Sequence, residues 1–184
     1  MYDLILENEK IRLRRAKKED ANGILRLLND TDVMLYYGES EISYDYALSE
    51  VNWFNELFEN NAGRWVIEDV LTGEYIGDIG IHNYDSKHRK GEIGYKLDKK
   101  FWGQGIMSSC VQAVLDFAFL DKNYNRVEAL VDIRNKACIA LLKKNNFTKE
   151  GILRDYEFEH SNFVDLEIHS ILKREYNNKR SEVY

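Results

Sequence analysis

The segment from residue 91 to residue 108, GEIGYKLDKKFWGQGIMS, constrains the fold more than any other part of the chain. Apolar side chains alternate with polar or small ones over residues 92–97, which is typical of a strand with one buried face. Gly103 and Gly105 then interrupt the pattern, and apolar residues recur at helical spacing from Ile106 onward. A strand, a glycine turn and a helix in that order point backbone N–H groups and the positive end of the helix dipole at a ligand above the turn. The segment therefore predicts a site for a phosphate or pyrophosphate.

Three kinds of phosphate-binding motif can be compared with this turn. A P-loop requires G-x-x-x-x-G-K-[ST], a string that the sequence lacks. A dinucleotide fingerprint requires G-x-G-x-x-G, but Ser108 stands at its third glycine and the turn comes too late for a complete dinucleotide domain. The acyl-CoA turn of the GNAT acyltransferases, Gln/Arg-x-x-Gly-x-Gly/Ala, matches Lys100 to Gly105 apart from the lysine at its first position. On the turn alone, a plain connection between a strand and a helix remains the alternative.

Further motifs extend this resemblance over most of the chain, from about residue 10 to residue 174. The segment EIGYKLDKKFWGQGIMS resembles the Rim group of GNAT enzymes, which acetylate protein N-termini, and its RimL branch in particular. The resemblance implies the GNAT fold, an α/β architecture with a mixed, largely antiparallel sheet of about six to seven strands flanked by about four helices. The other matching segments are Ile11–Arg14, Lys18–Ala21, Asn135–Phe147 and Phe147–Gly151.

The spacing of apolar residues predicts the individual elements along the chain. Period-two or continuous apolar runs predict strands at residues 10–15, 64–70, 74–84, 89–98, 126–133, 147–158 and 164–174. Helical spacing predicts helices at residues 18–29, 43–60, 106–120 and 136–145.

Composition limits the class of protein. A chain of 184 residues is long enough for one domain, which we expect to span residues 1–184. Two cysteines far apart predict no disulfide framework, and the absence of a signal segment or long apolar run predicts a cytoplasmic protein without a membrane span. The formal charge of −6 argues against nucleic acid and is compatible with a cationic substrate. The sequence is compatible with either a monomer or a homodimer.

The resemblance implies acetyl-CoA as the acetyl donor. It implies that the backbone of residues 95–97 pairs with pantetheine, that the amides of residues 103–107 hold the pyrophosphate and that Asn135 bonds the pantetheine arm. Asn135 could equally be an ordinary helix N-cap. Lysines near the turn and on the later helix could supply a local positive field, or form an ordinary solvated surface; they are Lys99, Lys100, Lys136, Lys143 and Lys144. The predicted cofactor-binding residues are Tyr95, Lys96, Leu97, Lys100, Gly103, Gln104, Gly105, Ile106, Met107 and Asn135.

The chemistry that the resemblance implies is direct attack of a neutral amine on the thioester. It requires a base, a proton donor for the leaving thiolate, and donors for the oxyanion, which the family supplies from the strand at residues 93–97. In many GNAT enzymes the proton donor is a tyrosine at the position of Leu142 in this chain. In RimL-like enzymes it is a serine at the position of Cys138. A thiol can donate a proton, although Cys138 could also be a small buried hydrophobe. Glu157, by resemblance, and Glu92, on the strand before the turn, are alternative bases, with Glu157 favoured.

The acceptor is less constrained than the donor. An α-amino group has a pKa of about 7.7–8.0 and needs only a modest base, whereas a lysine or polyamine amine has a pKa of about 10.4. This favours a protein N-terminus, such as that of a ribosomal protein. A small amine (a polyamine, aminoglycoside or amino acid) is the alternative, and the Tyr- and acid-rich segment 32–46 could bind such a cation or be a polar loop. A non-catalytic CoA-binding module is a third hypothesis. The four histidines have no spacing typical of a metal site, and we expect no metal.

Overall fold

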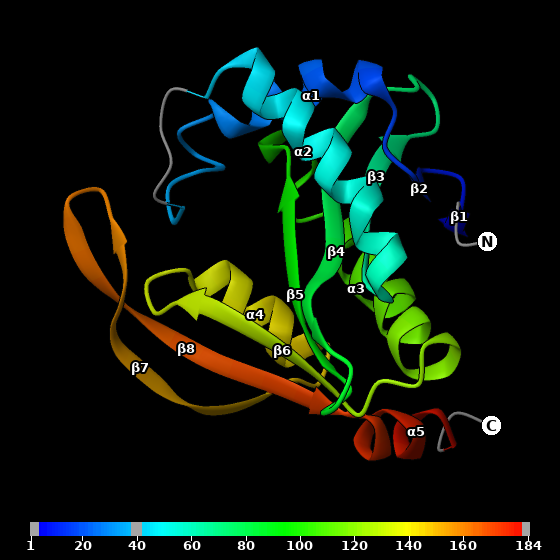
Figure 1. Ribbon diagram of the computed structural model, residues 1–184, viewed down its shortest axis with the longest axis vertical. Coiled ribbons are helices and arrows are strands. Elements are labelled where there is room, and N and C mark those ends of the chain that lie inside the picture. Colours follow the sequence, from blue (N-terminus) through cyan, green and yellow to red (C-terminus); the bar gives the residue numbers. More distant parts are fainter. Residues whose placement is uncertain (1–3, 38–41, 182–184) are drawn as a thin grey trace.

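The computed structural model describes residues 4–37 and 42–181 (Figure 1). In this part of the chain, eight strands form one sheet in the order β1-β2-β3-β4-β5-β6-β8-β7. All neighbouring strands are antiparallel except β5 and β6. The strands are β1 (Leu4–Glu7), β2 (Ile11–Arg14), β3 (Gly63–Asp69), β4 (Tyr75–Asp85), β5 (Lys90–Leu97), β6 (Arg126–Asp132), β7 (Thr148–Glu159) and β8 (Asn162–Leu172). The α-helices are α1 (Ala21–Leu28), α2 (Tyr44–Glu56), α3 (Ile106–Asp116), α4 (Lys136–Lys144) and α5 (Lys173–Ser181).

This architecture confirms the predicted fold class and adds two elements to it. The strand β1 has only four residues, too few to produce a periodic signal. The last strand is predicted to reach residue 174, but it ends at Leu172, and α5 begins at the next residue. The Leu172 amide donates a hydrogen bond to the carboxylate of Glu175 on α5 (3.0 Å). Tyr176, the buried apolar anchor of α5, donates a hydrogen bond to Asp116 on α3 (2.9 Å).

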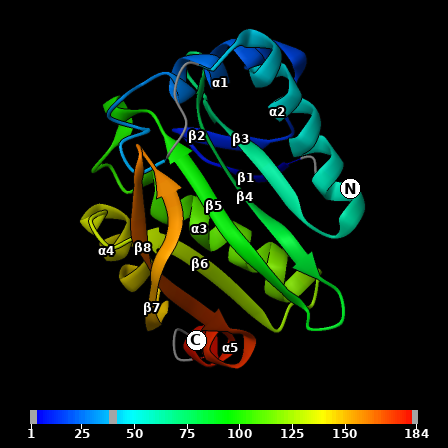
Figure 2. The same ribbon diagram turned by 60° about the vertical axis from the view of Figure 1, so that its left-hand side comes forward.

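Helices cover both faces of the sheet: α1 and α2 lie on one side, and α3 and α4 on the other (Figures 1 and 2). Successive side chains of a strand point to opposite faces of the sheet, so apolar side chains on both faces must be covered by helices. On β3, Trp65 and Ile67 pack into the core cluster that includes α3, whereas Val66 packs into the cluster formed with α1 and α2. Burial of each such large apolar side chain stabilises the fold by about 1.5–3 kcal/mol. No helix within the described residues has the length and apolarity needed to cross a membrane.

The sheet opens between its two parallel strands. β5 and β6 pair at three positions only, where residues 90–92 face residues 126–128. Over the described residues 93–97 and 129–132 the two strands no longer pair with each other, while β5 stays bonded to β4 and β6 to β8. Figures 1 and 2 show the resulting divergence of β5 from β6. The fold thus leaves two unpaired strand edges facing one another.

The hairpin of β7 and β8 bends beside this opening (Figure 1). The pairing register shifts between Leu153 and Glu157, where Asp155 adopts a positive φ of 49° and its amide donates to the Asp165 carboxylate (2.9 Å). A bulge of this kind bends the strand and redirects the side chains beyond it. It therefore sets the direction of the last residues of β7.

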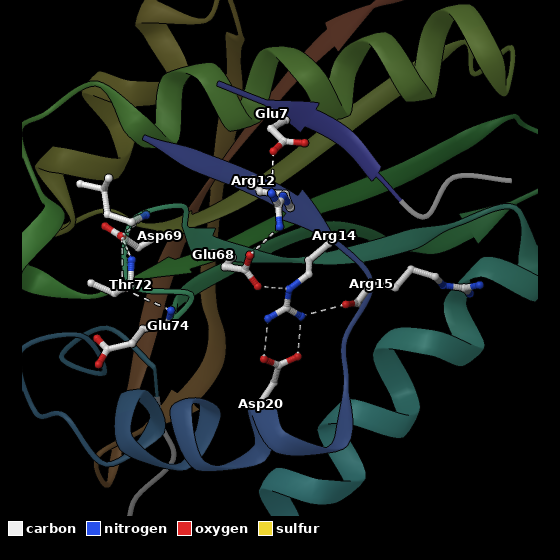
Figure 3. Close-up of polar contacts among 10 residues, drawn as sticks. Glu7, Arg12, Arg14, Arg15, Asp20, Glu68, Asp69, Thr72 and Glu74 are labelled. Atoms are coloured by element: carbon white, nitrogen blue, oxygen red, sulfur yellow. Dashed lines mark hydrogen bonds and ion pairs between the residues drawn. The ribbon is translucent and has the colours of Figure 1, made fainter. Parts of the chain in front are cut away.

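A buried ion-pair network joins β2, β3 and the start of α1 (Figure 3). The guanidinium of Arg14 donates to both carboxylate oxygens of Asp20 (2.8 and 2.9 Å) and also to Glu68. The side chains of all three residues are 11% exposed or less. Arg12 also contacts Glu68 (3.1 Å), but its side chain is 37% exposed.

Replacing Arg14 with leucine should lower the free energy of unfolding by about 3–5 kcal/mol, because two buried carboxylates would lose their common partner. The Arg12→Leu variant is the matched control, and its loss should stay below about 1 kcal/mol because exposed ion pairs contribute little. Urea unfolding measures both. Equal losses in the two variants would contradict the assignment of Arg14 as the centre of the network.

Candidate active site

A cavity of about 400 Å³ occupies the opening between β5 and β6. Its volume lies within the range of about 300–1,000 Å³ that is typical of small-molecule sites. The wall on β5 consists of residues 92–96, and the wall on β6 of residues 130–132. The remaining lining residues come from α1, the segment after it, α2, β3, β4, the start of α4, the end of β7 and β8, and include Tyr36, Tyr37, Glu50, Trp53, His82, Asn135, Cys138, Glu157 and Glu159.

The open edge of β5 presents backbone polar groups to this cavity. The Tyr37 hydroxyl donates to the carbonyl oxygen of Tyr95 (3.0 Å), so that carbonyl points away from β4. The N–H and C=O of one residue in a strand point to the same side, which places the Tyr95 amide N–H at the opening too. Lys96 lines the cavity, and its ammonium lies 5.5 Å from the centre of the Tyr37 ring. Leu97 ends the strand, and its carbonyl accepts a bond from the Trp102 indole (2.8 Å).

The start of α4 contributes a capped amide and a thiol. Asn135 is the N-cap of α4, and its side-chain oxygen accepts the amide N–H of Cys138 (3.0 Å). Its capping role is thus present in the structure, and Asn135 also lines the cavity. The Tyr95 hydroxyl lies 3.0 Å from Cys138 Sγ, and burial raises the pKa of that thiol to about 11. The thiol therefore keeps its proton at neutral pH. Leu142 is fully buried.

The predicted glycine turn connects the end of β5 to α3. Gly103 and Gly105 both have positive φ values (72° and 78°), a conformation that only glycine adopts readily. Gly105 is also the N-cap of α3, and no side chain caps this helix end. The first amides of α3 lack partners within the helix and carry the positive end of its dipole. The turn is exposed at Lys100, Gly103, Gln104 and Gly105, whereas Ile106 and Met107 are buried.

Two side chains fasten this turn to the rest of the molecule. Asp98 accepts the amide N–H of Lys100 (2.9 Å) and an ion pair from Arg26 on α1, and these contacts hold its pKa below its usual range although burial would raise it. Gln104 donates to the Lys100 carbonyl (3.0 Å). Lys99 is one of the lysines that could supply a positive field or form ordinary surface, and it makes an ion pair with Asp32 (2.5 Å) that balances its charge.

Glu92, the alternative base, is held by neighbours on β4. Its carboxylate accepts a hydrogen bond from Asn83 (3.1 Å) and lies 3.6 Å from His82 Nε2. Burial would raise its pKa, but the contacts with His82 and Asn83 outweigh this effect and hold the pKa of Glu92 below its usual range. A carboxylate stabilised in this way has a weakened affinity for protons.

The last residues of β7 bring two carboxyl groups to the cavity. Glu157, the favoured base, lines the cavity and is exposed. Glu159 lines it as well, but is only 8% exposed, and its Oε2 atom is buried without a hydrogen-bond partner within the described residues. Burial, followed by the charge of Glu157, raises the pKa of Glu159 to about 7.

Sequence reasoning missed Glu159. The signal that could have found it is the spacing Glu-Phe-Glu, since residues two apart in a strand share a face. The sequence nevertheless did not predict how far Glu157 and Glu159 are buried, because their burial depends on the bulge in β7 and on elements distant in the sequence.

The Tyr- and acid-rich segment 32–46, for which cation binding and a polar loop were the alternatives, reaches the cavity in part. Tyr36, Tyr37 and Tyr46 line it, while residues 38–41 lie outside the described residues. Among the described residues, no group of three or more His, Cys, Asp or Glu side chains is arranged to hold a metal ion.

Comparison with known proteins identifies the family of the chain. Residues 10–148 match the family model described as acetyltransferase (GNAT) domain. The chain is similar to the uncharacterized N-acetyltransferase YoaA of Bacillus subtilis, at 36% identity over 171 residues, 92% of this chain and 97% of that protein. It is also similar to spermidine N(1)-acetyltransferase of Vibrio cholerae, at 25% identity over 173 residues, 94% of this chain and 98% of that protein.

Among solved structures, the ribosomal-protein-S5-alanine acetyltransferase from Vibrio fischeri superposes with a TM-score of 0.81 at 25% identity, covering 91% of this chain and 96% of that one. The family model spans most of the chain, and enzymes of this family use acetyl-CoA. The chain therefore belongs to the GNAT family and is an N-acetyltransferase.

Proposed function

We propose that this protein transfers the acetyl group of acetyl-CoA to the N-terminal α-amino group of a protein, such as a ribosomal protein, as a RimL-like enzyme would. The observation that carries the proposal is the cavity between β5 and β6. This cavity contains both the open edge of β5 and the carboxyl group of Glu159, whose pKa is raised to about 7 by burial and the charge of Glu157. An α-ammonium of pKa about 7.7–8.0 can pass its proton to this group at a cost of about 1 kcal/mol. A lysine or polyamine ammonium of pKa about 10.4 would require about 4–5 kcal/mol.

In the proposed complex, acetyl-CoA lies along β5 with its pyrophosphate above the turn. The amides of residues 103–107 bind the pyrophosphate, and the backbone of residues 95–97 pairs with pantetheine. The Tyr95 amide, which points into the opening, stabilises the oxyanion. Cys138 donates a proton to the leaving thiolate, and the Tyr95 hydroxyl beside it orients the thiol.

Replacing Gly105 with valine should weaken acetyl-CoA binding at least about tenfold, because a side chain at this positive φ distorts the uncapped end of α3 and obstructs close approach of the pyrophosphate. Gly73→Val is the matched control: Gly73 has a similar φ of 71° and equally open surroundings, but it lies in the turn between β3 and β4. Calorimetric titration of both folded variants measures the affinity. Equal affinities for the two variants would contradict the proposed pyrophosphate site.

The identity of the proton donor can be tested at Cys138. Cys138→Ala should lower kcat about 100-fold, whereas Cys138→Ser should remain within about tenfold of the natural protein, because a hydroxyl can also donate. Acetyl-CoA affinity should change little in either variant. Full turnover in the alanine variant would show that the thiolate obtains its proton elsewhere.

A polyamine is the second candidate acceptor. The specific observation is the number of carboxylates around the cavity, since Glu50, Glu92 and Asp132 line it together with Glu157 and Glu159. Several negative groups attract a substrate with several positive charges. The similarity to a spermidine N(1)-acetyltransferase supports the same candidate.

An acceptor panel decides between these candidates. A peptide with a free N-terminus should accelerate CoA release from acetyl-CoA, measured with a thiol reagent, while the same peptide with a blocked N-terminus and an internal lysine should not. Faster release with spermidine than with the peptide would transfer the proposal to the polyamine. If neither aminoglycosides nor any other amine raised the rate above hydrolysis, the protein would be a CoA-binding module instead.

A further inference from the structure

Glu159 is a buried carboxyl group that has a side-chain hydrogen bond with Glu157 but keeps one oxygen that no hydrogen bond satisfies. It is 8% exposed and lines the cavity, and its buried Oε2 atom has no hydrogen-bond partner within residues 4–37 and 42–181. Leaving a buried polar atom without a partner costs about 1–3 kcal/mol. Such a cost is commonly retained where the group has a function.

The charges that face Glu159 come from three parts of the chain. Glu157 lies two residues earlier on β7, Asp132 ends β6, and Arg134 follows β6. Tyr37, from the segment after α1, also faces it. Asp132 accepts a hydrogen bond from Arg134 Nε (2.9 Å), so this cation is already paired with another carboxylate. Burial and the two acids therefore outweigh Arg134, and the pKa of Glu159 rises to about 7.

The bulge in β7 fixes the position of both glutamates. Asp165 on β8 holds the bulge by accepting the Asp155 amide N–H (2.9 Å). Beyond it the pairing resumes, with Glu157 opposite Val164 and Glu159 opposite Asn162. Glu157 and Glu159 thus share one face of the strand, and the inner of the two is shielded from solvent.

We propose that Glu159 is the general base of the acetyl transfer, and that Glu157, nearer to solvent, is a positioning residue whose negative charge strengthens the affinity of Glu159 for a proton. The inference rests on the proposed amine acetylation and reassigns the base within it. It differs from the role that the resemblance implies, in which Glu157 itself is the base.

The reaction balances with one carboxylate. The acceptor enters as an ammonium, and Glu159 takes one proton to leave a neutral amine. The nitrogen lone pair attacks the thioester carbon, the C–N bond forms and the C–S bond breaks. Cys138 donates its proton to the leaving thiolate, and the second proton of the nitrogen restores the Cys138 thiol. The products are the N-acetylated amine, CoA thiol and a protonated Glu159, which then releases its proton to solvent.

The pH dependence of kcat/KM separates the two glutamates. The natural protein should show a limb that rises through about pH 7 with the ionisation of Glu159. Glu159→Gln should remove this limb and lower kcat/KM about 100- to 1,000-fold. Glu157→Gln should keep the limb but move it about one unit to lower pH, because removal of a like charge lowers the pKa of Glu159. Glu74→Gln, an exposed control in the turn before β4, should match the natural protein. Loss of the limb in Glu157→Gln, with its retention in Glu159→Gln, would overturn the proposal.

A second measurement does not depend on activity. In the natural protein labelled with ¹³C at glutamate carboxyl carbons, one signal should titrate near pH 7 and should be missing from Glu159→Gln. If no glutamate signal titrated near pH 7 in the natural protein, the proposal would be overturned even if Glu159→Gln failed to fold. If no amine were acetylated, the proposed function would fail. A glutamate signal that still titrated near pH 7 would then show that Glu159 has the proton affinity of a base and that the failure has another cause.

Discussion

The parallel pairing of β5 and β6 is the constraint on which the rest of the site depends. Three residue pairs hold these strands together, and each strand is bonded on its outer edge to a different neighbour, β4 or β8. As the strands diverge, backbone groups that would normally pair within the sheet face a cavity instead. An unpaired strand edge readily bonds an extended ligand, because its N–H and C=O groups are already aligned. A flat sheet with full pairing would leave no such edge.

The electrostatics of the site divide along β5. At its end, the turn and the start of α3 carry a positive dipole that suits an anion, and the ion pair of Arg26 with Asp98 links this turn to α1. Along the cavity the carboxylates of α2, β5, β6 and β7 suit a cation. Tyr37 lines the cavity, and its hydroxyl donates to the Tyr95 carbonyl on the open edge of β5. In the complex that we propose, donor and acceptor meet beside Tyr95 and Cys138.

Local features of the fold could be predicted well, because they depend on neighbours in sequence. The period-two pattern of β5, the positive φ of Gly103 and Gly105 and the N-cap at Asn135 all follow from such local chemistry. β1 could not be found in this way, because four residues carry too little pattern and the strand is held by its pairing with β2. α5 was missed because its burial depends on one residue, Tyr176, and on its contact with α3.

The sequence by itself determined the order of the elements, the glycine turn before α3 and the set of residues able to donate or accept protons. Only the tertiary structure decided how those residues differ. Glu92, Glu157 and Glu159 have the same side chain but different surroundings. The Glu92 carboxylate is stabilised by His82 and Asn83. Glu157 is exposed, whereas Glu159 is buried beside other acids. Burial and charge are sums over groups brought together from distant parts of the chain. A carboxyl group therefore acquires its proton affinity only when the sheet has formed.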